Sequence, residues 1–370
     1  MQFRDLQSQY NNHKAEIDSA ISEVLSSSAF IMGSQVGELE EKLSEYVGVK
    51  HCITCANGTD ALQLALMAWG IGKGDAIFVP DFTFFSSAEV IACVGATPVF
   101  VDIDEVTFNM DPEALRRAID YTKNNTELKL KAIIAVDLFG QPANYPKIRS
   151  IADEYGMLLL EDGAQGFGGR IGDKKACSFG DISTTSFFPA KPLGCYGDGG
   201  AIFTDNDEWA ALLRSYRVHG KGVDKYDNVR IGMNSRLDTI QAAVLLAKLK
   251  FFDDEIEHCN QVARWYDNGL KSCDKVATPV IPDGFYSSWA QYTVRFDTEA
   301  ARDAAMQCLK ENGIPSMIYY RKPMHEQTAF ADYGVNPGCP VSEKVSRTCL
   351  SLPMGGYVSK EDVMEVCKNF

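Results

Sequence analysis

The chain has 370 residues, of which 45% are hydrophobic and 23% charged, and its net charge at pH 7 is −14. This composition excludes an intrinsically disordered chain, and the acidic balance argues against a general nucleic-acid-binding surface. The sequence has no secretory apolar segment and no apolar stretch of about 20 residues, so we expect a cytoplasmic protein without nucleic-acid or membrane partners.

Apolar strands alternate with helices along the first part of the chain. The patterns predict helices at residues 10–26, 38–46, 60–69, 86–93, 112–120 and 145–155, and strands at 52–55, 76–80, 98–102, 132–136 and 157–160. Continuous apolar strands, each followed by a helix, indicate an α/β fold with a mostly parallel sheet covered on both faces. Ligands of such sheets lie at the carboxyl ends of the strands.

The last third of the chain changes character. The patterns predict helices at 240–252 and 255–270, a linker at 271–282, strands at 290–296 and 316–320, and helices at 298–312 and from residue 360. We therefore divide the chain into a large domain, residues 1–250, and a small C-terminal α+β domain, residues 251–370.

A lysine and a carboxylate are placed as a pyridoxal phosphate site requires. Asp162 ends an apolar strand, and Lys191 follows Glu161 by 30 positions in the run Ser186-Phe-Phe-Pro-Ala-Lys191. The lysine amine would hold the cofactor aldehyde as a Schiff base, and the carboxylate would keep the ring nitrogen protonated. The alternative for Asp162 alone is a turn cap.

A strand-to-helix turn offers a phosphate site. Gly58 and Thr59 begin a helix, where free N–H groups and the helix dipole favour anions, and Ser186 adds a hydroxyl five residues before Lys191. Gln165 is placed to contact the ring hydroxyl, and Phe84 is a candidate to stack on the ring. Each of these residues taken singly also fits an ordinary turn or core position.

The cysteines do not indicate a metal site. Eleven cysteines are scattered through apolar segments, which favours reduced thiols over a disulfide framework. The one CxxC, Cys52 to Cys55, has no second CxxC or paired histidines and alternates like a strand, so we predict a structural role and no bound metal.

Together, Gly58-Thr59-Asp60, Glu161-Asp162-Gly-Ala-Gln165, Ser186 to Lys191 and Asn234-Ser-Arg236-Leu-Asp resemble the DegT/DnrJ/EryC1/StrS family of sugar aminotransferases. The resemblance spans nearly the whole chain and implies the type I, aspartate aminotransferase-like fold with pyridoxal 5'-phosphate bound to the large domain. It implies that Lys191 and Asp162 are catalytic, that Phe84 and Gln165 contact the ring, and that Gly58, Thr59, Asp60 and Ser186 hold the phosphate. It also implies a homodimer with shared active sites, in which Asn234 reaches the phosphate of the neighbouring subunit.

The implied reaction is ping-pong. Glutamate, which the family favours over the alternative donor glutamine, gives its amino group to the cofactor, which becomes pyridoxamine phosphate and then aminates a 3-oxo nucleotide sugar. The segments 186–203, 234–245 and 290–295 are most similar to UDP-2-acetamido-2-deoxy-3-oxo-glucuronate aminotransferases of O-antigen pathways, and thus imply a role in surface polysaccharide or glycan biosynthesis. Arg236, Tyr320 and His325 are candidate substrate contacts, and the guanidinium of Arg236 suits phosphate or carboxylate. For Arg236 and His325 the alternative is a surface or core salt bridge.

Several alternatives stay open. The substrate could be a dTDP-3-oxo-6-deoxyhexose or a 4-oxo UDP-sugar, since Gly163 and the run Tyr319-Tyr-Arg-Lys-Pro323 depart from the usual family pattern. A sugar 3-dehydratase of the same fold is disfavoured, because such enzymes carry histidine where Lys191 stands. A non-catalytic regulatory or sugar-binding relative is the remaining alternative.

Overall fold

The computed structural model describes residues 1–224 and 226–370. Its centre is a seven-stranded sheet with the strand order β1-β9-β8-β5-β4-β2-β3. The strands are β1 (His51–Cys55), β2 (Asp75–Pro80), β3 (Thr97–Val101), β4 (Lys129–Val136), β5 (Leu158–Asp162), β8 (Ile182–Ser186) and β9 (Gly200–Thr204). Strands β3, β2, β4, β5 and β8 pair in parallel, and β9 runs antiparallel to both β8 and β1. The predicted mostly parallel α/β sheet is confirmed.

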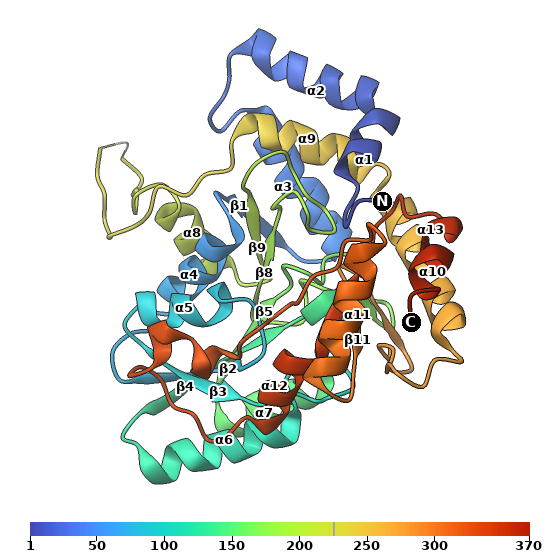
Figure 1. Cartoon of the computed structure of the whole chain (residues 1–370). Helices are drawn as coiled ribbons and strands as arrows, with labels where there is room; N and C mark the ends of the chain where they lie inside the picture. The colour runs from blue at the N-terminus through green and yellow to red at the C-terminus, as the bar shows by residue number, and fades with distance from the viewer. Residues whose placement is uncertain (225) are drawn as a thin grey trace.

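Both faces of the sheet are buried, which explains its continuously apolar strands. Because side chains alternate across a strand, Ile77 and Val79 join a core cluster with α4 (Gly58–Ala68) and α5 (Ser86–Cys93), whereas Ala76 and Phe78 join one with α6 (Pro112–Asn125) and α7 (Tyr145–Tyr155). Figure 1 shows these helix pairs on opposite sides of the sheet. Helix α8 (Asp207–Tyr216) packs beside α4; the pattern analysis missed it.

The N-terminal helices differ from the prediction. The single helix predicted at 10–26 is wrong, because His13, at φ −118° and ψ 19°, separates α1 (Leu6–Asn12) from α2 (Lys14–Ser27). Helix α2 packs on α9 (Thr239–Leu249), and α3 (Ser34–Val47) packs on the other side of α9 (Figure 1). The amphipathic α3 buries Val36, Leu39 and Leu43 against the sheet edge near β1.

The C-terminal part forms a second core around a two-stranded antiparallel sheet of β11 (Tyr292–Arg295) and β12 (Cys349–Leu352). Its helices are α10 (Phe252–Leu270), α11 (Glu299–Glu311), α12 (Pro340–Thr348) and α13 (Lys360–Cys367). The smaller elements are β6 (Arg170–Ile171), β7 (Lys174–Lys175), β10 (Phe285–Tyr286), η1 (Leu138–Gly140), η2 (Met324–Glu326) and η3 (Thr328–Phe330).

The strand predicted at 316–320 is wrong. Only Met317 pairs, through two backbone hydrogen bonds to Ser351, while Tyr319 and Tyr320 turn towards the core of the large sheet. Strand β11 pairs with β12, a strand that the sequence patterns did not predict.

The domain boundary at 250/251 stays a prediction. Helix α10 begins in the core of the large sheet with Phe252 and Ile256 and continues into the C-terminal core with Val262 and Tyr266. Residues Met324 to Cys349 pack back onto the large sheet in part. Among the described residues, no helix is both long and apolar enough to cross a membrane.

Candidate active site

Two strand ends place the central residues. Strands β5 and β8 are parallel neighbours, with Asp162 paired with Thr184, so their carboxyl ends bring Asp162 and Ser186 to one edge of the sheet. The backbone N–H of Asp137, which follows β4, donates to the Asp162 carbonyl at 3.0 Å and fixes this end of β5. This is the edge at which ligands of parallel sheets bind.

Asp162 is a buried carboxylate with partners on both oxygens. Its Oδ2 accepts from Ser87 Oγ on α5 at 2.7 Å, and its Oδ1 accepts from the N–H of Ala164 at 3.2 Å. Burial raises the pKa of Asp162, whereas the Ser87 hydrogen bond and the charge of Lys191 lower it. The carboxylate of Asp162 is therefore fixed by two hydrogen bonds and interacts electrostatically with Lys191.

Lys191 lies in the segment 187–199, which connects β8 to β9. Its N–H donates to the Phe188 carbonyl at 2.8 Å, and its side chain is half-buried. Burial lowers the pKa of Lys191, and the charge of Asp162 opposes this shift. A lowered pKa makes more of the neutral amine available, and the neutral amine is the form that attacks a carbonyl.

Two cations that the sequence patterns did not reveal hold this segment. Lys248 on α9 is 2% exposed and donates to the Gly194 carbonyl at 2.7 Å, with its Nζ 4.3 Å from the centre of the Tyr196 ring. Arg4 Nη2 donates to the carbonyl of Lys191 itself at 3.3 Å.

The N-terminal segment around Arg4 also contacts the C-terminal part of the chain. The Phe3 carbonyl accepts from the N–H of Met354 at 3.2 Å, and the Phe3 ring lies 6.1 Å from that of Tyr319. Residues 3–4 therefore connect the Lys191 segment to the small C-terminal core.

The structure brings Gly58 and Ser186 together. A Cβ built on Gly58 would lie 2.7 Å from Ser186 Cβ, so only glycine permits this approach at the start of α4. Thr59 Oγ1 is hydrogen-bonded to Ser86 Oγ at 2.8 Å, which adds hydroxyls from α4 and α5. The N–H of Asp60 is already bonded to Asn57 Oδ1 at 2.8 Å. The N–H groups of the first turn, with the hydroxyls, form a cradle suited to a phosphate.

Gln165, which follows β5, contacts Tyr320 from the C-terminal part of the chain. Gln165 Oε1 accepts from the N–H of Phe139 at 2.7 Å, and its Nε2 contacts Tyr320 Oη at 3.1 Å. The Phe84 ring is half-exposed and lies 6.1 Å from the Tyr320 ring. Burial raises the pKa of Tyr320, so its hydroxyl stays neutral.

His325 lies in an ion pair. Its Nδ1 is 2.6 Å from Asp81 Oδ2, its N–H donates to Asp81 Oδ1 at 2.9 Å, and its Nε2 is 3.6 Å from Glu343 Oε1. The Asp81 hydrogen bond raises the pKa of His325, while burial raises that of Asp81. Both ring nitrogens thus face carboxylates, and the pair ties η2 to the end of β2.

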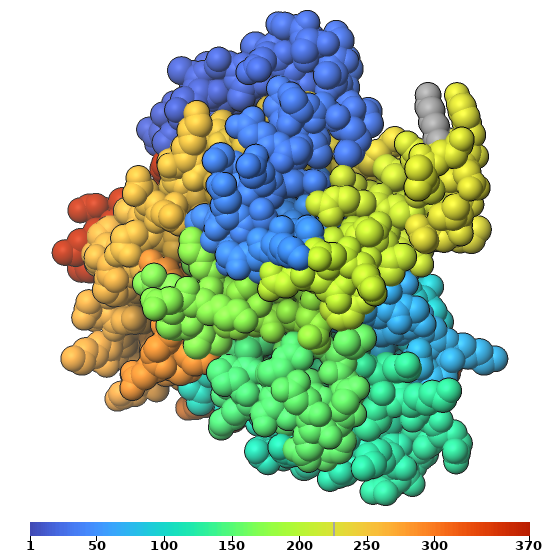
Figure 2. Space-filling model, turned by 180° about the vertical axis from the view of Figure 1, so that it is seen from behind, coloured from blue at the N-terminus to red at the C-terminus, as the bar shows by residue number. Residues whose placement is uncertain are grey.

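Arg236 lines an open basic groove of about 910 Å³, two residues after the exposed Asn234. Figure 2 shows the neighbouring part of the chain, coloured yellow, protruding from the body. The other lining residues are Met32, Arg214, Arg217, Val218, His219, Lys221, Asn228, Arg230, Ile231 and Gly232. The groove carries no acidic side chain among these residues, so it favours an anion.

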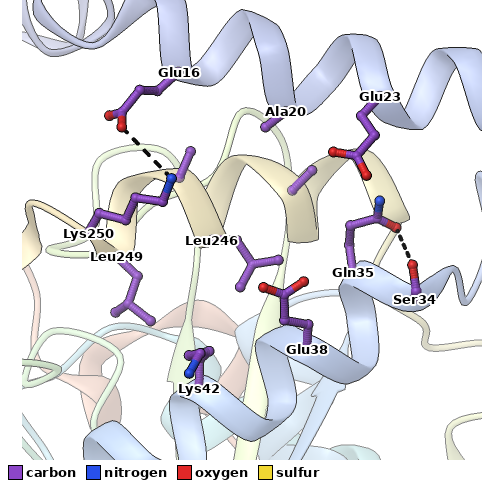
Figure 3. A pocket seen from close by; sticks show the side chains of 12 residues that line it. Glu16, Ala20, Glu23, Ser34, Gln35, Glu38, Lys42, Leu246, Leu249 and Lys250 are labelled. Atoms are coloured by element: carbon purple, nitrogen blue, oxygen red, sulfur yellow. Dashed lines mark hydrogen bonds and ion pairs between the residues drawn. The ribbon is translucent and has the colours of Figure 1, made fainter.

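A separate pocket of about 410 Å³ lies between α2, α3 and α9 (Figure 3). Glu16, Glu23 and Glu38 line it with Lys42 and Lys250, and Lys250 Nζ is 3.8 Å from Glu16. It contains none of the residues that the sequence analysis singled out, so the chemistry is placed at the sheet edge instead.

The residues at the sheet edge fit pyridoxal phosphate. The cradle at Gly58, which a Cβ would fill, suits the phosphate, and the buried Asp162 suits a protonated ring nitrogen. Lys191 supplies an amine of lowered pKa at the same edge.

Comparisons with known proteins point to the same chemistry. Residues 11–370 match the model of the DegT/DnrJ/EryC1/StrS aminotransferase family. The chain is 44% identical to a UDP-2-acetamido-2-deoxy-3-oxo-D-glucuronate aminotransferase of Pseudomonas aeruginosa, over 99% of this chain and 98% of that protein. It is also 44% identical to a pleiotropic regulatory protein of Geobacillus stearothermophilus, over 96% and 94%. A crystal structure of an aminotransferase of this family from Brucella abortus superposes with a TM-score of 0.97 at 51% identity, covering 100% of this chain and 98% of that one.

Proposed function

The chain belongs to the DegT/DnrJ/EryC1/StrS aminotransferase family, and from this premise we propose that it moves an amino group from glutamate to a 3-oxo nucleotide sugar. Enzymes of this family depend on pyridoxal phosphate. The observation that carries the proposal is the placement of a buried carboxylate, Asp162, beside a lysine of lowered pKa, Lys191, and a glycine cradle at Gly58.

Lys191 and Asp162 have the central roles in the proposed reaction. When bound, pyridoxal phosphate supplies an aldehyde that takes up amino groups and a cationic ring that withdraws electrons. Lys191 would hold the aldehyde carbon, and its amine would move a proton to and from the substrate carbon. Asp162, held by Ser87, would keep the ring nitrogen protonated.

The remaining cofactor contacts are proposed in line with the family resemblance. Gly58, Thr59, Asp60 and Ser186 would hold the phosphate, Phe84 would cover the ring, and Gln165 would contact the ring hydroxyl. Tyr320 would line the substrate side, since its hydroxyl accepts a hydrogen bond from Gln165 Nε2 at 3.1 Å. For His325 the ion pair with Asp81 favours a role in joining η2 to β2 over direct substrate contact.

The best-supported substrate is UDP-2-acetamido-2-deoxy-3-oxo-glucuronate, in surface polysaccharide or glycan biosynthesis. The support is the 44% identity over nearly the whole length of both proteins. A regulatory relative is the second candidate, because a protein named as regulatory is equally similar. The intact Lys191 and Asp162 favour the enzyme.

We further propose a homodimer in which the basic groove of one subunit faces the cofactor site of its partner. Asn234 is exposed and Arg236 lines the groove. The adjacent Phe30, Ile31 and Ile231 are 44%, 51% and 89% exposed, and such apolar side chains gathered around a charged groove are typical of an interface.

The test is the visible absorbance of purified protein loaded with pyridoxal phosphate. Glutamate should remove the visible band, and a 3-oxo UDP-sugar, but not its 4-oxo isomer, should restore it. Lys191→Ala should lose multiple turnover, whereas the control Lys174→Ala, on the exposed β7, should not. Restoration by the 4-oxo sugar alone would keep the aminotransferase and discard the regiochemistry, and no band at all would favour the regulatory candidate.

A further inference from the structure

Two buried carboxyl groups, those of Asp137 and Glu161, lie next to Asp162 along the sheet. Strands β4 and β5 pair Ala135 with Glu161, so Asp137, two residues after Ala135, lies on the same side of the sheet as Glu161. Asp137 follows β4 and is fully buried, and its N–H bonds the Asp162 carbonyl. Glu161, the residue before Asp162 on β5, is also fully buried and points to the opposite face of the sheet. Neither carboxyl group has a lysine or arginine within ion-pair distance among the described residues, so two buried negative charges would stand uncompensated.

The side-chain hydrogen bonds of Asp137 reach only one of its two carboxyl oxygens. Its Oδ1 accepts from Tyr145 Oη at 2.7 Å and from the N–H of Ala143 at 3.0 Å. Its Oδ2 is buried and receives no N–H or O–H donor. The turn after Asp162 lies against this oxygen, because a Cβ built on Gly166 would be 2.2 Å from Oδ2.

Glu161 has the opposite pattern. Its Oε1 accepts from the N–H of Cys177 at 2.5 Å, and its Oε2 accepts from Phe179 N at 2.6 Å, Gly180 N at 3.3 Å and Ser183 Oγ at 2.8 Å. Four donors converge on one carboxyl group, and such an environment stabilises the anion.

We propose that Asp137 is a neutral carboxylic acid whose Oδ2–H donates to Glu161, and that this pair, sharing one proton, is a positioning device for Asp162. Oδ1 then acts as the carbonyl-type acceptor and Oδ2 as the hydroxyl, which matches the one-sided hydrogen bonds. Only one negative charge lies next to Asp162 instead of two. The part of the proposal that concerns Asp162 rests on the proposed function; the protonation state of Asp137 does not.

The titratable neighbours agree with this assignment. Burial, and then the charge of Glu161, raise the pKa of Asp137 well above its usual range. Burial also raises the pKa of Glu161, but the bonds from Ser183, Cys177 and Phe179 oppose the shift. The other titratable groups facing the pair, Tyr145 and Cys177, have raised pKa values and stay neutral.

The protonation is tested on the cofactor-free protein with Asp137→Asn, whose amide can donate to Glu161 and accept from Tyr145. If Asp137 keeps its proton in the folded protein, only the unfolded chain releases a proton from this group above about pH 4. The free energy of unfolding of wild type then falls as pH rises. The Tm of Asp137→Asn relative to wild type should therefore increase steadily from pH 5 to pH 8. A Tm difference that is constant over this range would overturn the assignment.

A second measurement does not depend on the variant folding. Infrared spectra of cofactor-free wild type at pH 8 should contain the carbonyl stretch of a protonated carboxylic acid. The band should persist in Asp81→Asn, which removes another buried carboxyl group of raised pKa. Its absence in wild type would show that Asp137 is ionised.

The positioning role is tested separately, on cofactor binding. Asp137→Ala should weaken pyridoxal phosphate binding roughly tenfold or more and shift the bound cofactor's absorbance maximum, because the support of Asp162 loses buried hydrogen bonds. Asp137→Asn should restore both properties. An alanine variant with unchanged affinity and absorbance would refute the positioning role, and failure of the asparagine variant to rescue would also count against it.

Discussion

Replacing Lys248 by methionine should make the protein's stability respond differently to pH. Lys248 is almost wholly buried beneath the segment that carries Lys191, and burial lowers its pKa to about 8 from the usual 10.5. Methionine has a similar length and volume but neither the charge nor the hydrogen bond to Gly194. The variant therefore separates the cost of burying the ammonium from the benefit of its hydrogen bond.

The direction of the stability change with pH depends on how many protons the folded and unfolded chains bind. Between about pH 8 and 10.5 the unfolded chain keeps the lysine proton and the folded protein does not, so wild type gains stability as pH rises through this window. The shift of two and a half pKa units corresponds to about 3 kcal/mol. With an unfolding entropy of about 2.1 cal/mol/K per residue, 370 residues give roughly 0.8 kcal/mol per degree. The full effect is thus about 4 °C in Tm.

The assay is a thermal melt of wild type and Lys248→Met at half-unit steps from pH 7 to 10. The unbonded Gly194 carbonyl should lower the Tm of the variant by a constant amount, equivalent to about 1–3 kcal/mol, at every pH. On top of this offset, the Tm of the variant relative to wild type should fall by most of the 4 °C between pH 8 and 10. Lys250→Met, at an exposed position two residues further along the chain, is the matched control and should show no such slope. Parallel curves for wild type and Lys248→Met would refute the reasoning.

Two further predictions concern the cradle and the ion pair. Gly58→Ala should weaken binding of pyridoxal phosphate by roughly tenfold or more, because the new Cβ would lie 2.7 Å from Ser186 Cβ. In the control Gly37→Ala the new Cβ meets nothing within 4 Å, so binding should be unchanged and Tm slightly raised. Fluorescence titration of the cofactor measures both affinities, and equal affinities would count against the cradle. Asp81→Asn should lower Tm more at pH 6 than at pH 9. The raised pKa of His325 means that the Asp81–His325 pair stabilises the folded protein fully below about pH 6.5 and loses this effect as pH rises through the folded-state pKa of His325. An equal loss of Tm at both pH values would contradict a charged His325.

The sheet was predictable from the sequence because its strands are short, continuously apolar and separated by amphipathic helices. The run Leu158 to Asp162 and the helix that begins at Gly58 both follow local rules. The segment 316–320 also satisfies a local strand pattern, but only Met317 pairs, and its partner, Ser351 of β12, lies far along the chain. His13 interrupts a helix that the apolar period alone would continue.

The candidate site likewise contains some residues that local motifs predict and others that they do not. Lys191, Asp162 and Gln165 lie in short motifs whose residue types indicate their chemistry. Their supports do not, because Arg4 and Lys248 are ordinary surface residue types by sequence, and Arg4 is 187 positions from the lysine whose carbonyl it contacts. Such contacts depend on how distant elements pack, and no local pattern encodes them.

The contacts of residues 3 and 4 have a consequence for the order in which the protein matures on the ribosome. Phe3 and Arg4 are synthesised long before Met354, whose N–H donates to the Phe3 carbonyl. At roughly 5–20 residues per second, these two residues wait tens of seconds for that partner. These two residues are thus among the last to complete their native contacts, and a nascent chain released before residue 354 would lack the hydrogen bond that anchors Phe3 beside Arg4.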